Sequence, residues 1–397
     1  MKVLYLYQGG DSFGGQATFF SRIHPFLKNS FDFKVICHRN GPGYEYLLYN
    51  KINAIRKTLP IFPHTTQFHI SFYNVKTILL LPKDLVVGLL NILFEIKKEK
   101  PDLVFIGSTG LFLCSPVARM LGYKNVVFAC EIIDKGHFGI RKFLITSLLE
   151  KHADKILCVS NAVLEKFKYR TKACLLFDAV DTAVFDPDKF DKRQLRKQHD
   201  IENNSHVLGI FGGVQYAKGH DLMIDALVLL RERFPKIILL IVGAVPKKKT
   251  YMLNFLFKRE ISERLESVIR KNNLHDNVRF VNQTPKVAEI YSLCDLVCMP
   301  SVEEAFGDPV IEAGAMKIPV VAYARGGPLD SIYDNTTGVL FHKLCAEDLA
   351  STIINLLNNP KKMKLMGEAA REVVLKNFSY AVYVPRLKEI LVNLVNY

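Results

Sequence analysis

Short apolar runs alternate with longer amphipathic segments along most of the chain. Apolar runs of strand length recur in both halves, at residues 1–7, 33–38, 103–106, 125–129, 155–159, 207–211, 237–242, 278–281, 296–299, 319–322 and 339–341. The segments between them have helical periodicity, as at residues 85–98, and a final helix is expected at 378–397. This alternation predicts an α/β fold with parallel, doubly wound sheets. Residues 40–67 are rich in proline, glycine and aromatic side chains and predict an irregular segment.

The length of the chain indicates two domains. Its 397 residues, 49% of them hydrophobic, are too many for one ordinary core and suit two globular domains of under about 200 residues each. The first apolar run is short and ends in glycines, which predicts a strand and not a signal peptide. Polar residues interrupt the most apolar stretch, 78–96, so we do not expect it to span a membrane. The eight scattered cysteines predict buried free thiols in a reducing cytosol.

One stretch in the second half has the residue types of a ligand site. The strand predicted at 296–299 leads into a loop with Glu304, a tight turn at Phe306 and Gly307, and a short helix that includes Glu312. A strand that ends in such a loop and feeds a helix is where α/β sheets bind ligands. The free N–H groups of the helix start suit phosphate, and a carboxylate inside the helix can accept hydrogen bonds from two ribose hydroxyls. Taken as isolated residues, the two carboxylates would also suit a helix cap and a solvated helix face.

The whole stretch resembles the signature of the retaining family 4 glycosyltransferases. That signature comprises Pro–Ser, a glutamate, Phe–Gly, Glu–Ala and a closing Gly–x–Pro–Val–Val–Ala. The matching residues are Pro300, Ser301, Glu304, Phe306, Gly307, Glu312, Ala313, Pro319, Val320, Val321 and Ala322. The turn departs from the pattern, because Lys317 stands where a glycine is usual. The resemblance implies the GT-B fold, with two Rossmann-like domains facing each other across a cleft. It also implies that Glu312 holds the donor ribose and that Glu304 acts at the donor sugar near the reacting centre.

Two glycine-bearing loops are expected at the donor phosphates. Gly14 and Gly15 follow the first strand, and glycines there let a diphosphate approach backbone N–H groups. Gly212, Gly213 and Lys218 follow the strand at 207–211. The resemblance implies that Lys218 grips the donor diphosphate, although Gly213 replaces the arginine that the family usually has. A surface role for Lys218 and a simple turn at Gly14–Gly15 are the alternatives.

The acceptor side departs from the family pattern. Where many relatives have a His–Asp pair, this chain has Cys130 and Glu131, with His137 six residues later. Glu131 and His137 are the acceptor-side candidates, and a loop histidine without a role is the alternative for His137. The segment 175–187 resembles the family's inter-domain connection and places the domains at 1–180 and 181–377. The helix at 378–397 is expected to cross back to the first domain.

The net charge of +14 calls for an anionic partner or surface. We find no nucleic-acid motif and no long basic arm, so nucleic acid is not an expected partner. Lysines alternate with aromatic residues at 247–259, beginning with Lys247, Lys248 and Lys249. This composition suits an anionic membrane surface and equally suits a solvated helix after a lysine-rich loop. The expected location is cytoplasmic, peripheral on the inner face of the membrane.

The resemblance implies a metal-independent hexosyltransferase without a cofactor. It would move a sugar from a nucleotide diphosphate sugar to a hydroxyl of a glycan or lipid-linked acceptor, with retention at the anomeric carbon. Two alternatives keep the fold. One is a nucleotide-sugar epimerase or hydrolase, for which Glu131 and His137 are the acid/base candidates. The other is a non-catalytic sugar-nucleotide binding protein.

Overall fold

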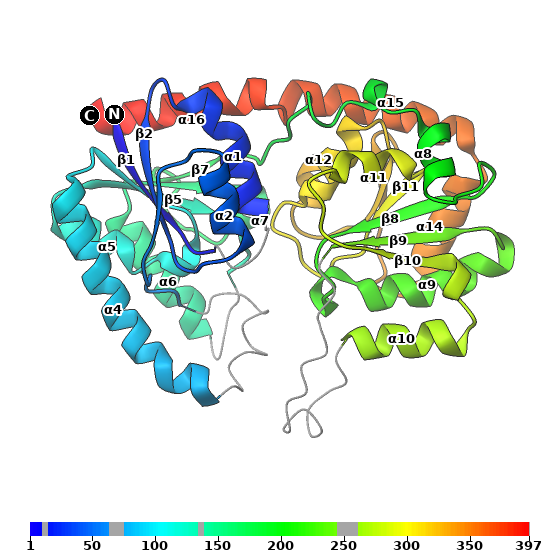
Figure 1. The fold of residues 1–397 in the computed structure, drawn as a ribbon, viewed down its shortest axis with the longest axis horizontal. Helices are drawn as coiled ribbons and strands as arrows, with labels where there is room; N and C mark the ends of the chain where they lie inside the picture. Colours follow the sequence, from blue (N-terminus) through cyan, green and yellow to red (C-terminus); the bar gives the residue numbers. More distant parts are fainter. Residues whose placement is uncertain (10–14, 63–74, 134–138, 244–260, 397) are drawn as a thin grey trace. The chain divides into compact units, whose positions relative to one another are not determined.

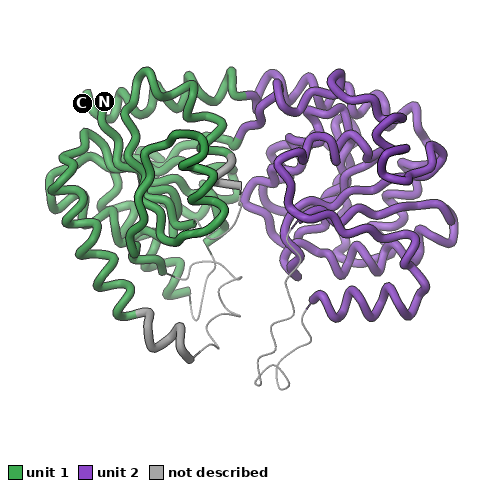
Figure 2. The backbone as a smooth tube through the Cα atoms, viewed as in Figure 1, with its two compact units in different colours: residues 1–178, 380–397 green, residues 179–379 purple. Residues whose placement is uncertain are grey.

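The computed structural model describes residues 1–9, 15–62, 75–133, 139–243 and 261–396 (Figure 1). The chain divides into two compact units (Figure 2). Unit 1 comprises Met1–Asp178 and Tyr380–Tyr397, and unit 2 comprises Ala179–Ser379. Unit 1 is therefore built from both ends of the chain, and the last helix, α16 (Tyr380–Asn396), contributes to its core.

Unit 1 has a seven-stranded sheet in the order β3-β2-β1-β4-β5-β6-β7. Neighbouring strands pair in parallel, with Val3 of β1 beside Phe33 of β2 and Leu103 of β4. The strands are β1 (Lys2–Tyr7), β2 (Asp32–Cys37), β3 (Ala54–Arg56), β4 (Leu103–Ile106), β5 (Lys124–Ala129), β6 (Lys155–Cys158) and β7 (Ala173–Leu175). The helices are α1 (Gly15–Leu27), α2 (Pro42–Tyr49), α4 (Val75–Glu99), α5 (Cys114–Met120), α6 (Ile140–His152), α7 (Asn161–Leu164) and α16, with the 3-10 turn η1 (Thr109–Leu111).

Unit 2 has a six-stranded parallel sheet in the order β10-β9-β8-β11-β12-β13. Every residue of β8, β9 and β11 is buried, as expected for parallel strands covered by helices on both faces. The strands are β8 (Val207–Phe211), β9 (Ile238–Val242), β10 (Val278–Val281), β11 (Leu296–Met299), β12 (Val320–Tyr323) and β13 (Gly338–Phe341). The helices are α8 (Lys192–Gln198), α9 (His220–Arg233), α10 (Ile261–Lys271), α11 (Val287–Leu293), α12 (Asp308–Ala315), α13 (Pro328–Ser331), α14 (Ala346–Leu357) and α15 (Pro360–Asn377). The described residues of this unit also include the 3-10 turns η3 (Pro187–Lys189), η4 (Tyr216–Lys218) and η6 (His275–Asn277).

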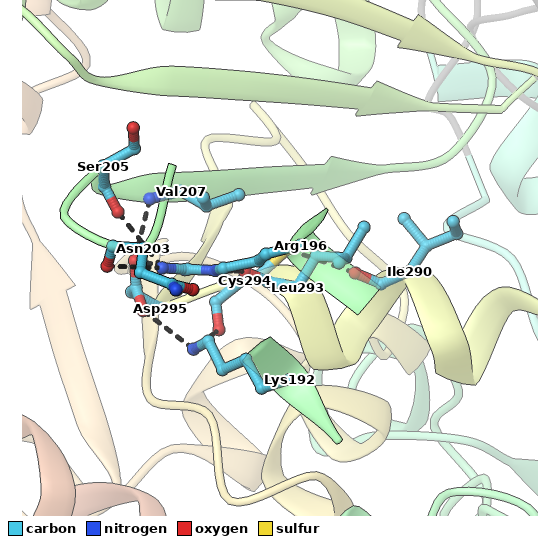
Figure 3. Close-up of polar contacts among 9 residues, drawn as sticks. All are labelled: Lys192, Arg196, Asn203, Ser205, Val207, Ile290, Leu293, Cys294 and Asp295. Carbon is cyan, nitrogen blue, oxygen red and sulfur yellow. Dashed lines mark hydrogen bonds and ion pairs between the residues drawn. The ribbon is translucent and has the colours of Figure 1, made fainter. Parts of the chain in front are cut away.

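A partly buried ion pair ties α8 to the amino-terminal edge of the unit 2 sheet (Figure 3). The Nη2 atom of Arg196 lies 2.8 Å from Oδ2 of Asp295, the residue just before β11. The same guanidinium donates to the carbonyl oxygens of Leu293, Asn203 and Ser205. Because these donors and acceptors satisfy one another, the charges can stay buried without a large desolvation cost.

The sequence-based prediction was wrong for residues 40–67, which contain α2 and β3. Pro42 begins α2, where a missing N–H has no consequence because the first helical turn leaves its N–H groups unpaired. The helix predicted at 85–98 begins earlier and continues through Pro82. No helix in the described part of the chain is long and apolar enough to cross a membrane.

Candidate functional site

In each sheet, the order in which strands are added reverses at one pair of neighbouring strands. In unit 2, the chain runs outward from β8 through β9 to β10, then returns to add β11, β12 and β13 on the other side of β8. In unit 1, β1 and β4 form the corresponding pair. The carboxyl ends of such strand pairs leave a crevice between diverging loops, and α/β sheets bind ligands there. The loops after β8 and β11, and after β1 and β4, are therefore where each unit is built to hold a ligand.

Close backbone packing fixes the loop between β8 and α9. Gly212 has φ 131° and Gly219 has φ 70°, conformations that L side chains rarely adopt. A Cβ atom on Gly219 would lie only 2.1 Å from the carbonyl oxygen of Pro300, in the loop after β11. The N–H of Val302 donates to the carbonyl oxygen of Ala217 at 3.0 Å. The loop after β8 and the loop after β11 are thus joined along their backbones.

An ion pair joins the two predicted donor-site residues Lys218 and Glu304. The Lys218 Nζ atom lies 2.6 Å from Oε2 of Glu304. The side chain of Lys218 is 29% exposed and that of Glu304 is 13% exposed, so the pair is shielded yet open to a ligand. Burial lowers the pKa of Lys218, but the charge of Glu304, helped by Asp308, raises it above its ordinary value. Lys218 therefore remains a cation at neutral pH.

The loop after β12 completes the enclosure of Glu304. The N–H of Gly327 donates to the carbonyl oxygen of Glu304 at 2.9 Å, and a Cβ on Gly326 would lie 2.3 Å from that oxygen. Gly307, with φ 96°, then turns the chain into α12. Three loops therefore meet around Glu304, and α12 begins four residues after it, at Asp308.

Glu312, the predicted ribose ligand, is held from within the core. Tyr291 of α11 donates its hydroxyl to Oε2 of Glu312 at 2.8 Å. The ring of Tyr291 is fully buried and stacks on Phe211, at the end of β8, with 3.6 Å between centroids and 5° between planes. Burial and the neighbouring carboxylate raise the pKa of Tyr291 well above its usual range. The hydroxyl therefore stays protonated and keeps donating to Glu312.

Buried polar groups lie on both sides of Lys218. His220 is fully buried, and its Nδ1 atom lies 3.3 Å from the carbonyl oxygen of Gln215. Burial lowers the pKa of His220 to about 4, so the ring is neutral at pH 7. Within the described residues, the buried atoms Nε2 of His220, Oε1 of Gln215 and Oγ of Ser301 have no hydrogen-bond partner. The loops after β8 and β11, which contact each other here, therefore both contain buried polar atoms available for further hydrogen bonds.

In unit 1, the carboxylate of Glu131 lies beside the strand pair at which the strand order reverses. Glu131 follows β5, and its Oε1 atom accepts a hydrogen bond from Nε2 of Gln8, after β1, at 2.8 Å. Its Oε2 atom accepts from Oγ1 of Thr109, after β4, at 3.3 Å. Three strand ends thus converge on the half-buried Glu131 side chain.

The predicted site residues that the structure describes lie at these strand ends. In unit 2, Gly212, Gly213, Lys218, Glu304, Phe306, Gly307 and Glu312 all come from the loops after β8 and β11 or from α12. Phe306 is buried and packs against Phe378, with 5.7 Å between ring centroids. In unit 1, Gly15 begins α1, whereas Gly14 and His137 lie outside the described residues. The lysine-rich segment 247–259 of unit 2 also lies outside them.

Sequence reasoning missed the residues that support the candidate side chains. Tyr291 lies inside an apolar helix, and Phe211 reads as the end of a buried strand. Gln8 and Thr109 are isolated polar residues after strands, and only the fold brings them to Glu131. Lys317, at the usual glycine position, adopts φ 59°, so the backbone keeps a left-handed turn there without a glycine.

Comparisons with known proteins find similarity mainly in the second half of the chain. Residues 191–373 match the model of the family described as "Glycosyl transferases group 1". A D-inositol 3-phosphate glycosyltransferase of Corynebacterium aurimucosum is 32% identical over 220 residues, covering 53% of this chain and 48% of that protein. A GDP-mannose-dependent alpha-(1-6)-phosphatidylinositol monomannoside mannosyltransferase of Mycolicibacterium smegmatis is 26% identical over 331 residues, covering 79% and 82%. The chain spans about half the length of the first curated relatives it matches.

Solved structures confirm the fold class. HepE from Anabaena, solved in complex with UDP, superimposes with a TM-score of 0.80 at 19% identity and covers 99% of this chain and 100% of that one. WaaG, a glycosyltransferase involved in lipopolysaccharide biosynthesis, gives a TM-score of 0.72 at 17% identity, covering 98% and 99%. The prediction of two Rossmann-like domains of the GT-B class, each with a parallel sheet, is confirmed.

Proposed function

We propose that this chain, a member of the glycosyl transferases group 1 family through residues 191–373, transfers a sugar from a nucleotide diphosphate sugar to a hydroxyl group of a glycan or lipid-linked acceptor. In this reaction the bond between the anomeric carbon and the donor phosphate oxygen breaks. A bond from the same carbon to the acceptor oxygen forms, with retention of configuration. The acceptor's proton goes to the departing phosphate, so the products are the glycosylated acceptor and the nucleoside diphosphate.

The ion pair of Lys218 with Glu304 is the observation that supports this proposal best. It places a cation and a carboxylate 2.6 Å apart where the strand order reverses in unit 2. A diphosphate entering the site would compete with Glu304 for the ammonium of Lys218. Glu304 would then be available to accept hydrogen bonds from the donor sugar. A shielded cation at the leaving group stabilises charge that develops in the transition state.

Backbone groups complete the proposed donor site. Gly213 would supply a backbone N–H that no side chain screens, whereas the N–H of Gly212 donates to the carbonyl oxygen of Val242 at 2.8 Å, so Gly212 would contribute close backbone approach only. Glu312, positioned by Tyr291, would accept hydrogen bonds from the ribose hydroxyls. Lys218 and this N–H group would balance the diphosphate charge, so the proposal includes neither a metal nor a cofactor.

Glu131 keeps the epimerase or hydrolase reading as a second candidate. It is a carboxylate at a strand end of unit 1, fixed by hydrogen bonds from Gln8 and Thr109. An enzyme of that class needs its own acid/base group. Incubation of the donor without acceptor separates the readings, because only the second candidate would release nucleotide with a free or rearranged sugar.

The test of the proposal is a donor screen followed by one substitution. Nucleoside diphosphates that bind should raise the thermal stability of the protein by mass action, and the pattern would identify the base. With the sugar donor of that base, Lys218→Ala should lower turnover by roughly a hundredfold or more. Lys236→Ala, which removes an exposed lysine of the same unit, is the matched control. Equal turnover in wild type and Lys218→Ala would rule out the proposed role of this lysine.

Peripheral attachment to the cytoplasmic side of a membrane is part of the proposal. The charge of +14 supports an anionic surface as a partner. Replacing Lys247, Lys248 and Lys249 with glutamate tests the lysine-rich segment and should weaken binding to anionic vesicles. The described residues provide a separate and more specific candidate for the contact with lipid.

A further inference from the structure

The outer face of α4 in unit 1 is apolar where a surface helix is normally polar. Val86, Leu90 and Phe94 follow one another at intervals of four residues, so they lie in a line along the helix. Their exposed fractions are 58%, 60% and 57%. The opposite side of the helix packs into the core through Ile92 and Ile96, which are fully buried. The helix is thus apolar on two sides, and packing within unit 1 explains only one of them.

The first turns of α6 have the same property. Ile140, Phe143 and Leu144 lie on one helix face at i, i+3 and i+4. Ile140 and Phe143 are 64% and 68% exposed. Such large apolar side chains occur singly on most surfaces, but grouped ones indicate a binding surface.

These two helices belong to one row over the sheet. α4 contacts α5 and α5 contacts α6, and all three helices belong to unit 1 (Figure 1). In a parallel sheet, a helix that follows a strand begins at the carboxyl edge. The amino-terminal part of α4 and the start of α6 therefore lie toward the edge that also holds Glu131.

Basic residues border the apolar line. Lys83 precedes it on α4, and Lys97, Lys98 and Lys100 follow it, all exposed. Lys57 lies over the ring of Phe94, with its Nζ atom 5.6 Å from the ring centroid. Lys142, half-buried, stands between Ile140 and Phe143 of α6.

Acidic residues do little to offset this charge. Glu95 is buried on the inner side of α4 and offsets the charge of Lys57 at 3.4 Å, and Glu99 is paired with Lys2 and Lys34. Asp84 is the exposed acid of the described part of α4. The surface is therefore both apolar and positively charged.

We propose that this surface, the α4–α6 face, docks the protein onto an anionic lipid membrane. The apolar side chains would enter the boundary between headgroups and acyl chains, while the lysines would contact the acidic headgroups. The contact would bring the carboxyl edge of unit 1 close to the lipid surface. The docking itself does not depend on the donor site of unit 2.

The charge pattern favours lipid over a second copy of the chain. In a symmetric dimer through this face, Lys83, Lys97 and Lys98 of one protomer would meet the same lysines of its partner. Like charges in contact oppose such an association. An anionic bilayer presents the opposite charge and an apolar layer beneath it, which matches both properties of the face.

The absence of tryptophan from the sequence allows a direct test. Leu90→Trp places a single reporter on the face, and Leu365→Trp places one at a similarly exposed leucine of α15 in unit 2. Vesicles of phosphatidylglycerol in phosphatidylcholine should shift the emission of the first variant to shorter wavelength and leave the second unchanged. If the protein pellets with vesicles but Leu90→Trp shows no shift, another surface binds and the proposal is wrong.

A charge reversal tests the electrostatic part. Each basic residue near an anionic surface contributes about 1 kcal/mol, so Lys97→Glu with Lys98→Glu should weaken vesicle binding about 30-fold or more. Lys361→Glu with Lys364→Glu makes the same charge change in unit 2 and should have little effect. Equal losses in the two double variants would show that net charge alone drives binding, which would overturn the assignment to this face.

Two further outcomes would also reject the proposal. One is no binding to anionic vesicles at low salt. The other is a dimer in light scattering that becomes a monomer on Leu90→Ser with Phe94→Ser, because the face would then be a protein interface. Nucleotide binding by unit 2, measured on the same variants, should stay at the wild-type level. If the wild-type protein binds no nucleoside diphosphate, this result counts against the proposed function but not against the docking surface.

Discussion

At the scale of single residues, the proposed donor site depends on side chains that do not themselves belong to its proposed ligand contacts. Tyr291 is the best example, because its ring is fixed by Phe211 and its hydroxyl donates to Glu312 at 2.8 Å. A carboxylate held in one orientation can bind two hydroxyls without first losing side-chain freedom. The fixed orientation of the Glu312 carboxylate therefore depends on α11, a helix whose sequence has no feature of a binding site.

This arrangement predicts a graded loss of nucleotide affinity. Glu312→Gln should weaken binding strongly, since a hydrogen bond to a charged group contributes about 1.5–3 kcal/mol. Tyr291→Phe keeps the stacked ring and removes one neutral donor, so it should weaken binding by about fivefold. Calorimetric titration with the nucleoside diphosphate measures both, with the exposed Tyr333→Phe as the control. Unchanged affinity in Glu312→Gln would remove the ribose role from this residue.

His220 gives a prediction about pH. Its pKa in the folded protein is about 4, below the ordinary value of 6.5, because the ring is buried. Between these two values the unfolded chain binds a proton that the folded chain does not, so stability falls as pH falls from about 6.5 to 4. At pH 4.5 the loss is about 2.5 kcal/mol relative to pH 7. Urea unfolding at both pH values should show this extra loss in wild type and not in His220→Gln, and parallel pH profiles would contradict it.

At the scale of elements, local patterns explain the long buried strands and miss the short edge ones. Strands such as β8 and β11 are continuous apolar runs, since helices cover both faces of their sheet. β3 and β7 have three residues each and lie at the two edges of the unit 1 sheet. Their strand conformation comes from pairing with β2 and β6, which a local pattern does not contain.

The residues of the candidate site also fall into two groups, those that the sequence could identify as candidates and those that it could not. Lys218, Glu304 and Glu312 could be predicted because loops after strands and helix starts have recognisable residues. Tyr291, Gln8 and Thr109 could not, because their roles arise from contacts with residues 21, 123 and 22 positions away. Positions that support a site are set by the fold, and only positions that contact the ligand have a local pattern.

The attachment of α8 gives a prediction for one element. Arg196→Met would leave three carbonyl oxygens without their donor and Asp295 with Lys192 as its cation. Because Asp295 keeps a cation and is 24% exposed, the main cost is that of the unsatisfied carbonyl oxygens, about 1–3 kcal/mol. Urea unfolding should show a loss of this size, whereas Arg193→Met, on the exposed side of the same helix, should be nearly neutral. Similar stability of the two variants would mean that the network in Figure 3 adds little.

At the scale of the whole molecule, α16 brings the end of the chain into the unit formed by its beginning. Tyr383 and Leu387 of this helix pack among core side chains of unit 1, including Tyr5 and Leu27. Phe19 of α1 contacts Tyr383 edge to face, with 5.3 Å between ring centroids. Residues from the two ends of the sequence thus share one core, and unit 2 is an insertion within unit 1.

This topology predicts that a change near the end of the sequence weakens its beginning. Leu387→Ala removes a side chain that is 2% exposed and should cost about 2–5 kcal/mol, because a cavity remains. Hydrogen exchange should then speed up in β1 and α1 of unit 1, while β8 and β9 of unit 2 keep their protection. Val392→Ala, in the same helix but 39% exposed, is the control. Faster exchange in unit 2 with protection retained in β1 would mean that α16 stabilises the neighbouring α15 and not the amino-terminal core.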